Sequence, residues 1–116
     1  MKMCKVLKNG AVLADEIRIA DRFFQRLVGL LKDKALASNQ GLLLNRCRQV
    51  HTIGMKFPID VIFLSRDGEV LLIQNDMRSG MMSPTVKGAF WCLELMSGVA
   101  NEQGLTLHDH VTFQSL

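Results

Sequence analysis

The sequence has little aromatic character: tyrosine is absent, and phenylalanine and tryptophan together make up 6% of the 116 residues. Proteins that bind single-stranded nucleic acid stack bases on aromatic side chains set among basic ones. No such interleaving occurs here, so the composition disfavours nucleic-acid binding. The first half is nevertheless basic, because residues 1–58 carry eleven Lys and Arg against four Asp and Glu, whereas residues 59–116 carry three against seven. A basic half can attract an acidic partner, although folding can interleave the two halves.

Long apolar runs and abundant cysteines are also lacking. No run of about 18 uncharged apolar residues suggests a membrane-spanning helix, and the apolar run before Lys8 is too short for a secretory signal. We therefore expect a cytoplasmic protein without membrane association. Cys4, Cys47 and Cys92 have no motif spacing, so reduced thiols are expected rather than a disulfide framework.

Length and composition predict a single domain over residues 1–116. Apolar residues make up 48% of the chain, and a chain of this length buries about two thirds of its unfolded surface in one core. Neither a disulfide nor a metal ion is needed to hold such a domain together.

Hairpin signals dominate the pattern along the chain. Asn9-Gly10 and Asp67-Gly68 each separate two apolar runs, and such pairs favour the tight turns of antiparallel hairpins. Asp21 is a suitable N-cap for an amphipathic helix over about 21–33, and a short helix is expected over about 98–104. Because strands and helices do not alternate regularly, we predict a mainly β fold, an antiparallel β-sandwich or partly closed barrel with these two helices.

The segment 47–60, CRQVHTIGMKFPID, combines a thiol, an imidazole and a thioether. Cys47, His51 and Met55 recur at intervals of four residues and are a ligand set suited to Cu(I). The surrounding β-branched residues, a glycine and a proline argue against a helix. On a strand the spacing places successive ligands about 13 Å apart, so neither a metal nor a cofactor is predicted.

Read as a strand, this segment has one face for the interior and one for solvent. The odd positions, which include His51 and Ile53, are expected to face inward. The even positions, which include Arg48 and Lys56, are expected to face solvent.

Strand spacing also separates Cys47 and His51 too far for a nucleophile and its base. Carboxylates set among apolar residues are the remaining partners for His51, namely Asp60, Glu94 and Asp109. Each could satisfy backbone groups around it, because an unpaired buried carboxylate is costly. Alternatively, one of them could pair with His51 in an open pocket as a general base or a ligand anchor.

These pieces of sequence resemble the domain of unknown function 192 family, small uncharacterised proteins of bacteria and archaea. The resemblance covers about residues 19–111 and lies in Arg26 with Gly29-Leu30, in Gly41-Leu42-Leu43, in VHTIGMKFPIDVIFL with DGEVL, and in LELMSG. It implies a mostly β sandwich-like fold with a flanking helix and no established activity. The polar positions that it marks are Arg26, His51, Thr52, Met55, Asp60, Glu94 and Asp109. Family members usually have Gly-Asp at the last site, where this chain has His108-Asp109.

We therefore predict a module that binds an unknown small molecule or protein in a cleft around His51 and Asp60. The expected ligand-binding residues are Arg26, His51, Thr52, Met55, Asp60, Trp91 and Glu94, with Arg26 holding an anionic group. One alternative is a small cofactor-independent hydrolase with His51 as general base; its catalytic candidates are His51, Asp60 and Glu94. The other alternative is a structural or assembly module. Whether the protein is an enzyme, and which oligomer it forms, are left open.

Overall fold

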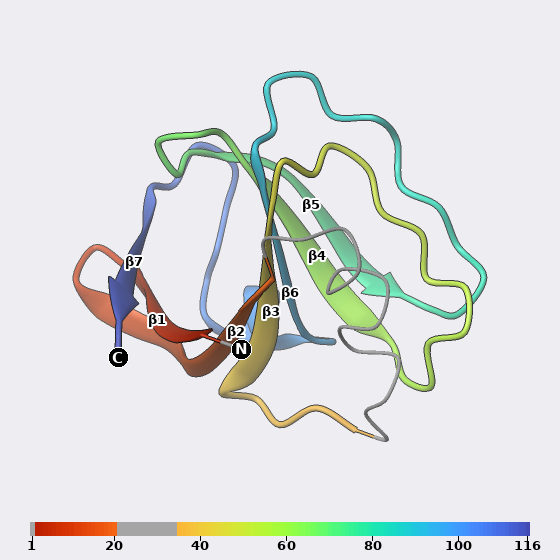
Figure 1. The fold of residues 1–116 in the computed structure, drawn as a ribbon, viewed down its shortest axis with the longest axis horizontal. Helices are drawn as coiled ribbons and strands as arrows, with labels where there is room; N and C mark the ends of the chain where they lie inside the picture. Colours follow the sequence, from red (N-terminus) through yellow and green to blue (C-terminus); the bar gives the residue numbers. More distant parts are fainter. Residues whose placement is uncertain (1, 21–34) are drawn as a thin grey trace.

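The structure, a computed structural model, describes residues 2–20 and 35–116. Within them, seven strands form one mixed sheet in the order β5-β4-β6-β3-β2-β1-β7 (Figure 1). The strands are β1 (Lys2–Lys8), β2 (Ala11–Ala20), β3 (Gln40–Asn45), β4 (Ile59–Leu64), β5 (Val70–Met77), β6 (Trp91–Met96) and β7 (Val111–Ser115). The predicted mainly β fold is confirmed. The helix expected over about 21–33 lies outside the described residues, whereas the short one is present as α2 (Val99–Glu102).

Both hairpin signals are confirmed. Asn9 and Gly10 have φ of 52° and 79°, the left-handed values that a two-residue type I′ turn requires, and they join the antiparallel strands β1 and β2. Asp67-Gly68 lies in the turn between the antiparallel strands β4 and β5. The antiparallel expectation fails at one pair, because β2 and β3 run parallel. A parallel pair needs a crossover of a dozen or more residues, and residues 21–39 are long enough to provide it.

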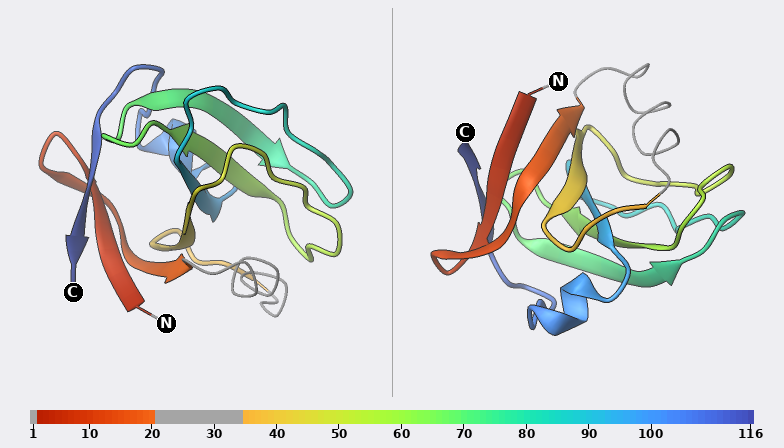
Figure 2. Two further views of the ribbon diagram at one scale, coloured as in Figure 1. Left: turned by 45° about the horizontal axis from the view of Figure 1, so that its top comes forward. Right: turned by 90° about the horizontal axis from the view of Figure 1, so that it is seen from below.

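The two edge strands of the sheet approach each other at one end. Val70 N donates to Asp109 O at 2.8 Å, His108 N donates to Val70 O at 2.9 Å, and Val111 N donates to Gly68 O at 2.9 Å. We call residues 68–70 and 108–111 the clasp. It joins the start of β5 to the chain that enters β7, as both views of Figure 2 show. The sheet therefore fits a partly open barrel whose two edges meet at one end.

Two apolar clusters pack on opposite faces of the central strands. All six residues of β4 are buried, as expected for a central strand that is apolar on both faces apart from Asp60. Ile62 and Leu64 belong to the cluster that contains α2, β1 and β2 residues. Val61 and Phe63 belong to the second cluster, which contains Cys47 and Val50. The segment that follows β3 thus covers one face of the sheet.

Candidate functional site

Residues 46–57 and 78–90 lie side by side and antiparallel, and we call them together the arm (Figure 1). Hydrogen bonds between the two segments join Cys47 N to Phe90 O, Val86 N to Arg48 O, Ser83 N to Val50 O and Thr52 N to Met81 O, at 2.8–3.1 Å. His51 and Met82 form an antiparallel bridge. The base of the arm therefore adjoins the end of β3 and the start of β6. We call its other end, formed by residues 51–56 and 78–82, the tip, and His51 of the sequence motif lies there.

The two faces of the arm differ from the expected alternation. Cys47 is buried, but so are Val50 and Thr52, whereas His51 and Ile53 are exposed. The expectation of inward odd positions was therefore wrong. The strict alternation of a strand requires a regular extended backbone, and here Arg48 and Gln49 are both exposed, which shifts the inward positions by one.

Thr52 fastens the tip of the arm. Its backbone N–H donates to Met81 O at 2.9 Å, and its hydroxyl donates to Arg78 O and accepts from Met81 N. Its carbonyl accepts from Met55 N at 3.1 Å. Because Thr52 is only 1% exposed, its polar atoms serve the two segments of the arm.

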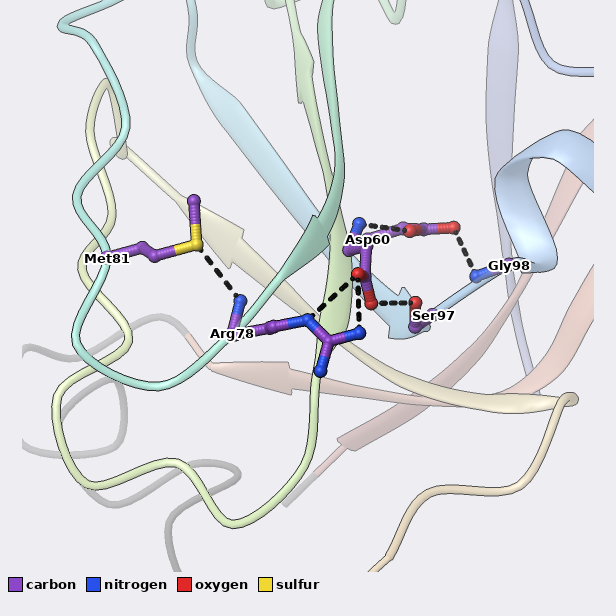
Figure 3. Close-up of polar contacts among 6 residues, drawn as sticks. Asp60, Arg78, Met81, Ser97 and Gly98 are labelled. Atoms are coloured by element: carbon purple, nitrogen blue, oxygen red, sulfur yellow. Dashed lines mark hydrogen bonds and ion pairs between the residues drawn. The ribbon is translucent and has the colours of Figure 1, made fainter.

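Asp60 lies inside the molecule and bonds to backbone groups (Figure 3). One carboxylate oxygen accepts from Asp76 N at 2.9 Å, and the other accepts from Gly98 N at 2.9 Å and Ala100 N at 3.0 Å. Gly98, the residue before α2, has φ of 96° and provides no side-chain cap. Asp60 therefore supplies from β4 the acceptor that helix starts usually obtain from a neighbouring side chain.

Asp76, which the sequence reasoning missed, continues this network toward the arm. Its carboxylate accepts from Ser97 Oγ at 2.7 Å and from Arg78 Nε at 3.1 Å. The hydrogen bond from Ser97 is the main cause that lowers the pKa of Asp76, and Arg78 adds to it. The φ of Asp76 is 53°. The only signal in the sequence was Asn75-Asp76 near the end of a strand, residues that tolerate this conformation.

The strand register places Asp60 and Glu94 on opposite faces of the sheet. Asp60 is paired with Leu95, and Glu94 is paired with the next residue of β4, Val61. Successive side chains of a strand point to opposite faces. Because Asp60 is 0% exposed and Glu94 is 8% exposed, these two carboxylates do not meet His51 on one open surface.

The remaining predicted residues lie at different places. Trp91, at the start of β6, donates from Nε1 to Arg66 O at 3.2 Å and packs edge-on against Phe113. Met55 is half-buried against the second apolar cluster. Arg26 lies outside the described residues. Among residues 2–20 and 35–116, no group of three or more His, Cys, Asp or Glu is placed to hold a metal ion.

Asp109 anchors the clasp. Its carboxylate accepts from Thr106 N at 2.8 Å and pairs with Lys8 Nζ at 3.1 Å. The Thr106 hydrogen bond is the main cause that lowers the pKa of Asp109, and Lys8 lowers it further. His108 has φ of 71°, so a non-glycine residue adopts the left-handed conformation just before Asp109. Of the two roles expected for the carboxylates, Asp109 therefore has the first, which is to satisfy backbone groups around it.

The tip of the arm exposes apolar side chains. Ile53, Met82 and Met81 are 66%, 65% and 43% exposed, and the bridge places Met82 beside His51. In the sequence, Met81-Met82 stand among glycine, serine and proline residues, a composition typical of a loop. The overlooked signal is that loops seldom place two large apolar residues in solvent without a use for them.

The arm is also uniformly basic. Its two segments contain no Asp or Glu, and their cations are Arg46, Arg48, Lys56, Arg78 and Lys87. All five are exposed. His51, the exposed side chain that faces Met82, therefore lies on a surface that is both apolar and positively charged.

The comparisons with known proteins identify a family and a fold. The profile of DUF192, described as "Uncharacterized ACR", matches residues 5–113. A crystal structure of a protein of unknown function from Novosphingobium aromaticivorans DSM 12444 superposes with a TM-score of 0.83 at 19% identity, covering 95% of this chain and 83% of that one. A crystal structure titled a "putative transcription regulator" from Sinorhizobium meliloti 1021 has a TM-score of 0.83 at 18% identity, covering 97% and 92%. No curated protein gives a significant match. The described residues include no helix long and apolar enough to cross a membrane.

Proposed function

Because the chain belongs to the DUF192 family, whose description assigns no activity, we propose its function from the site alone: a binding module that docks another protein on the outer surface of the arm. The observation that carries this proposal is the cluster of Ile53, Met81 and Met82 in solvent beside His51. Exposed apolar side chains that cluster mark interaction sites, whereas single ones are ordinary. Methionine also adapts its shape to different partner surfaces.

A protein partner suits this surface better than a small molecule. Sites for small molecules are concave and cover most of the ligand surface, whereas Ile53 and Met82 are about two-thirds exposed. Thr52 and Asp60 use their polar atoms on the backbone of the arm and of α2. We therefore retain His51 in the site, assign Thr52 to the support of the arm, and assign Asp60 to the support of α2 and the end of β5.

The hydrolase alternative lacks a supporting contact. A general base is usually oriented by a hydrogen-bonded partner. Among the described residues, His51 forms no hydrogen bond or ion pair with a carboxylate, and both oxygens of Asp60 accept from the backbone N–H groups of Asp76, Gly98 and Ala100. No observation therefore favours catalysis over docking.

The proposal can be tested by selecting binders for the whole chain. Peptides selected on the immobilised protein from a random display library should bind the double variant Ile53→Ser, Met82→Ser at least tenfold more weakly. Burying one such side chain is worth about 1.5–3 kcal/mol, and about 1.4 kcal/mol changes affinity tenfold. Affinities would be measured by fluorescence anisotropy.

The matched control is Val12→Ser with Leu116→Ser, which removes apolar side chains that are 46% and 67% exposed outside the arm. This control should bind the selected peptides like the wild type. Equal binding to the arm variant, or an equal loss in the control, would exclude the arm as the docking surface. Circular dichroism melting of both variants establishes that they are folded.

A further inference from the structure

We infer that the segment docked on the arm is extended and carries acidic residues beside its apolar ones. The inference rests on the proposed docking function and adds the chemical class of the partner. It starts from the charge of the arm, which has five Lys and Arg and no Asp or Glu in residues 46–57 and 78–90.

Four of these cations have no counter-charge within the described chain. Arg78 pairs with Asp76 at 3.1 Å. Arg46, Arg48, Lys56 and Lys87 are exposed and form no ion pair with any described residue. Like charges gathered on one surface repel one another and attract a partner of opposite sign. The arm therefore offers charge complementarity to an acidic partner and none to a basic one.

The register of the arm orders charge and apolar surface along its length. Near the base of the arm, Arg48 O accepts from Val86 N, the residue before Lys87 in the neighbouring segment. The His51 and Met82 pair follows, and Ile53 lies beyond it at the tip. Three of the four unpaired cations, Arg46, Arg48 and Lys87, thus lie toward the base, and Lys56 follows Ile53 in the tip. An extended peptide that runs along the arm would place its acidic residues against the base, where most of the unpaired cations lie, and its apolar ones against the exposed apolar side chains of the tip.

An anionic membrane surface also combines negative charge with apolar groups, but the tip fits it less well. Protein segments that lie in a membrane interface use tryptophan and phenylalanine as anchors. The exposed residues of the arm include no aromatic residue, because Phe57 and Phe90 are both half-buried. We therefore commit to a peptide segment and treat vesicle binding as an outcome of the test.

The test uses the full chain with its methionines labelled by carbon-13 at the methyl group. Three sets of synthetic ten-residue peptides are titrated, each with four leucines at one end and four glutamates, glutamines or lysines at the other, and each in both chain directions. Vesicles of phosphatidylglycerol with phosphatidylcholine are titrated as a fourth ligand. At low salt, the glutamate set should bind at least tenfold more tightly than the glutamine set and should shift the Met81 and Met82 methyl signals. Added salt should reduce this preference, since it screens exposed charges.

The double variant Arg48→Glu, Lys87→Glu should reverse the order, so that the lysine set binds more tightly than the glutamate set. Its matched control is Lys2→Glu with Lys5→Glu on β1, which should keep the preference of the wild type. Equal binding of the glutamate and glutamine sets to the arm would overturn the acidic-partner inference and leave the docking function standing. Binding of no set to the arm would overturn both. Tighter binding to vesicles than to any peptide would overturn the inference in favour of a membrane surface.

Discussion

At Asp60, a single side chain joins three parts of the fold. Its carboxylate accepts hydrogen bonds from the end of β5, at Asp76, and from the first turn of α2, at Gly98 and Ala100. A buried carboxylate is stable only when such donors replace its water. The acid in the apolar run of β4 thus positions α2 against the sheet, and Asp76 links the same network to Arg78 of the arm.

Replacing Asp60 with Asn should destabilise the protein strongly. The amide retains one oxygen, so its NH2 group must face at least one backbone N–H that the carboxylate now accepts. A buried donor left unsatisfied, together with the loss of charge-assisted hydrogen bonds, costs roughly 2–4 kcal/mol. The free energy of unfolding in urea measures this loss.

The matched control for that measurement is Asp15→Asn. Asp15 is exposed and accepts from Asn39 Nδ2 at 2.9 Å, a contact that the asparagine oxygen can keep, so the change should stay below about 0.5 kcal/mol. An Asp60→Asn variant as stable as this control would contradict the structural role of Asp60.

At the scale of elements, the clasp decides how far the sheet closes. It depends on Gly68, whose φ is 95° and which approaches Val111 so closely that a Cβ would lie 2.2 Å from Val111 O. The same two residues are joined by the hydrogen bond from Val111 N to Gly68 O. No side chain fits between the two backbones. Gly68 therefore allows β5 and the entry to β7 to meet.

Gly68→Ala should consequently open the clasp. We expect a loss of about 2–4 kcal/mol, because the added Cβ meets backbone that must move in addition to adopting a strained φ. Amide hydrogen exchange should accelerate at Val70 and Val111 and remain slow at the β3 and β6 pair. Gly10→Ala is the matched control, since Gly10 has φ of 79° with no atom within 4 Å of its Cβ position. Equal destabilisation by both variants would assign the effect to φ alone and contradict the close approach.

At the scale of the whole molecule, three carboxylates in the second half of the chain make the free energy of unfolding depend on pH. The pKa of Asp67 is lowered chiefly by the Ser65 hydroxyl, that of Asp76 by the Ser97 hydroxyl, and that of Asp109 by the Thr106 N–H. Each binds its proton more weakly in the folded than in the unfolded chain. Its contribution is therefore complete above the unfolded pKa of about 3.9 and is lost as the pH falls through the lower folded value.

The urea midpoint should accordingly be nearly constant above about pH 5 and should fall as the pH drops below about 4. Asp109→Asn should lower the midpoint at neutral pH and lose less on acidification, because one of the three groups no longer titrates. Urea unfolding curves for both proteins between neutral and acidic pH measure the two slopes. A midpoint that rises below pH 4, or identical losses in both proteins, would contradict the contribution of Asp109.

The sequence by itself determined the local features and the family. Asn9-Gly10 and Asp67-Gly68 act through backbone conformations that neighbouring residues set, so the hairpins were predictable, as was the central position of the apolar strand β4. The short helix near residue 100 was predictable because it, too, follows from residues that are neighbours in the sequence. The matching pieces around His51 and Asp60 were sufficient to predict the family.

Only the tertiary structure decided which side chains share a surface. A shift of one residue in an extended segment exchanges its two faces, and in the arm such a shift leaves His51 and Ile53 exposed and Thr52 buried against residues of the other segment. The parallel pairing of β2 with β3 and the approach of Gly68 to Val111 join residues far apart in the chain. Likewise, the pairing of β4 with β6 put Asp60 and Glu94 on opposite faces. Such contacts depend on how distant segments pack, which local residue patterns do not specify.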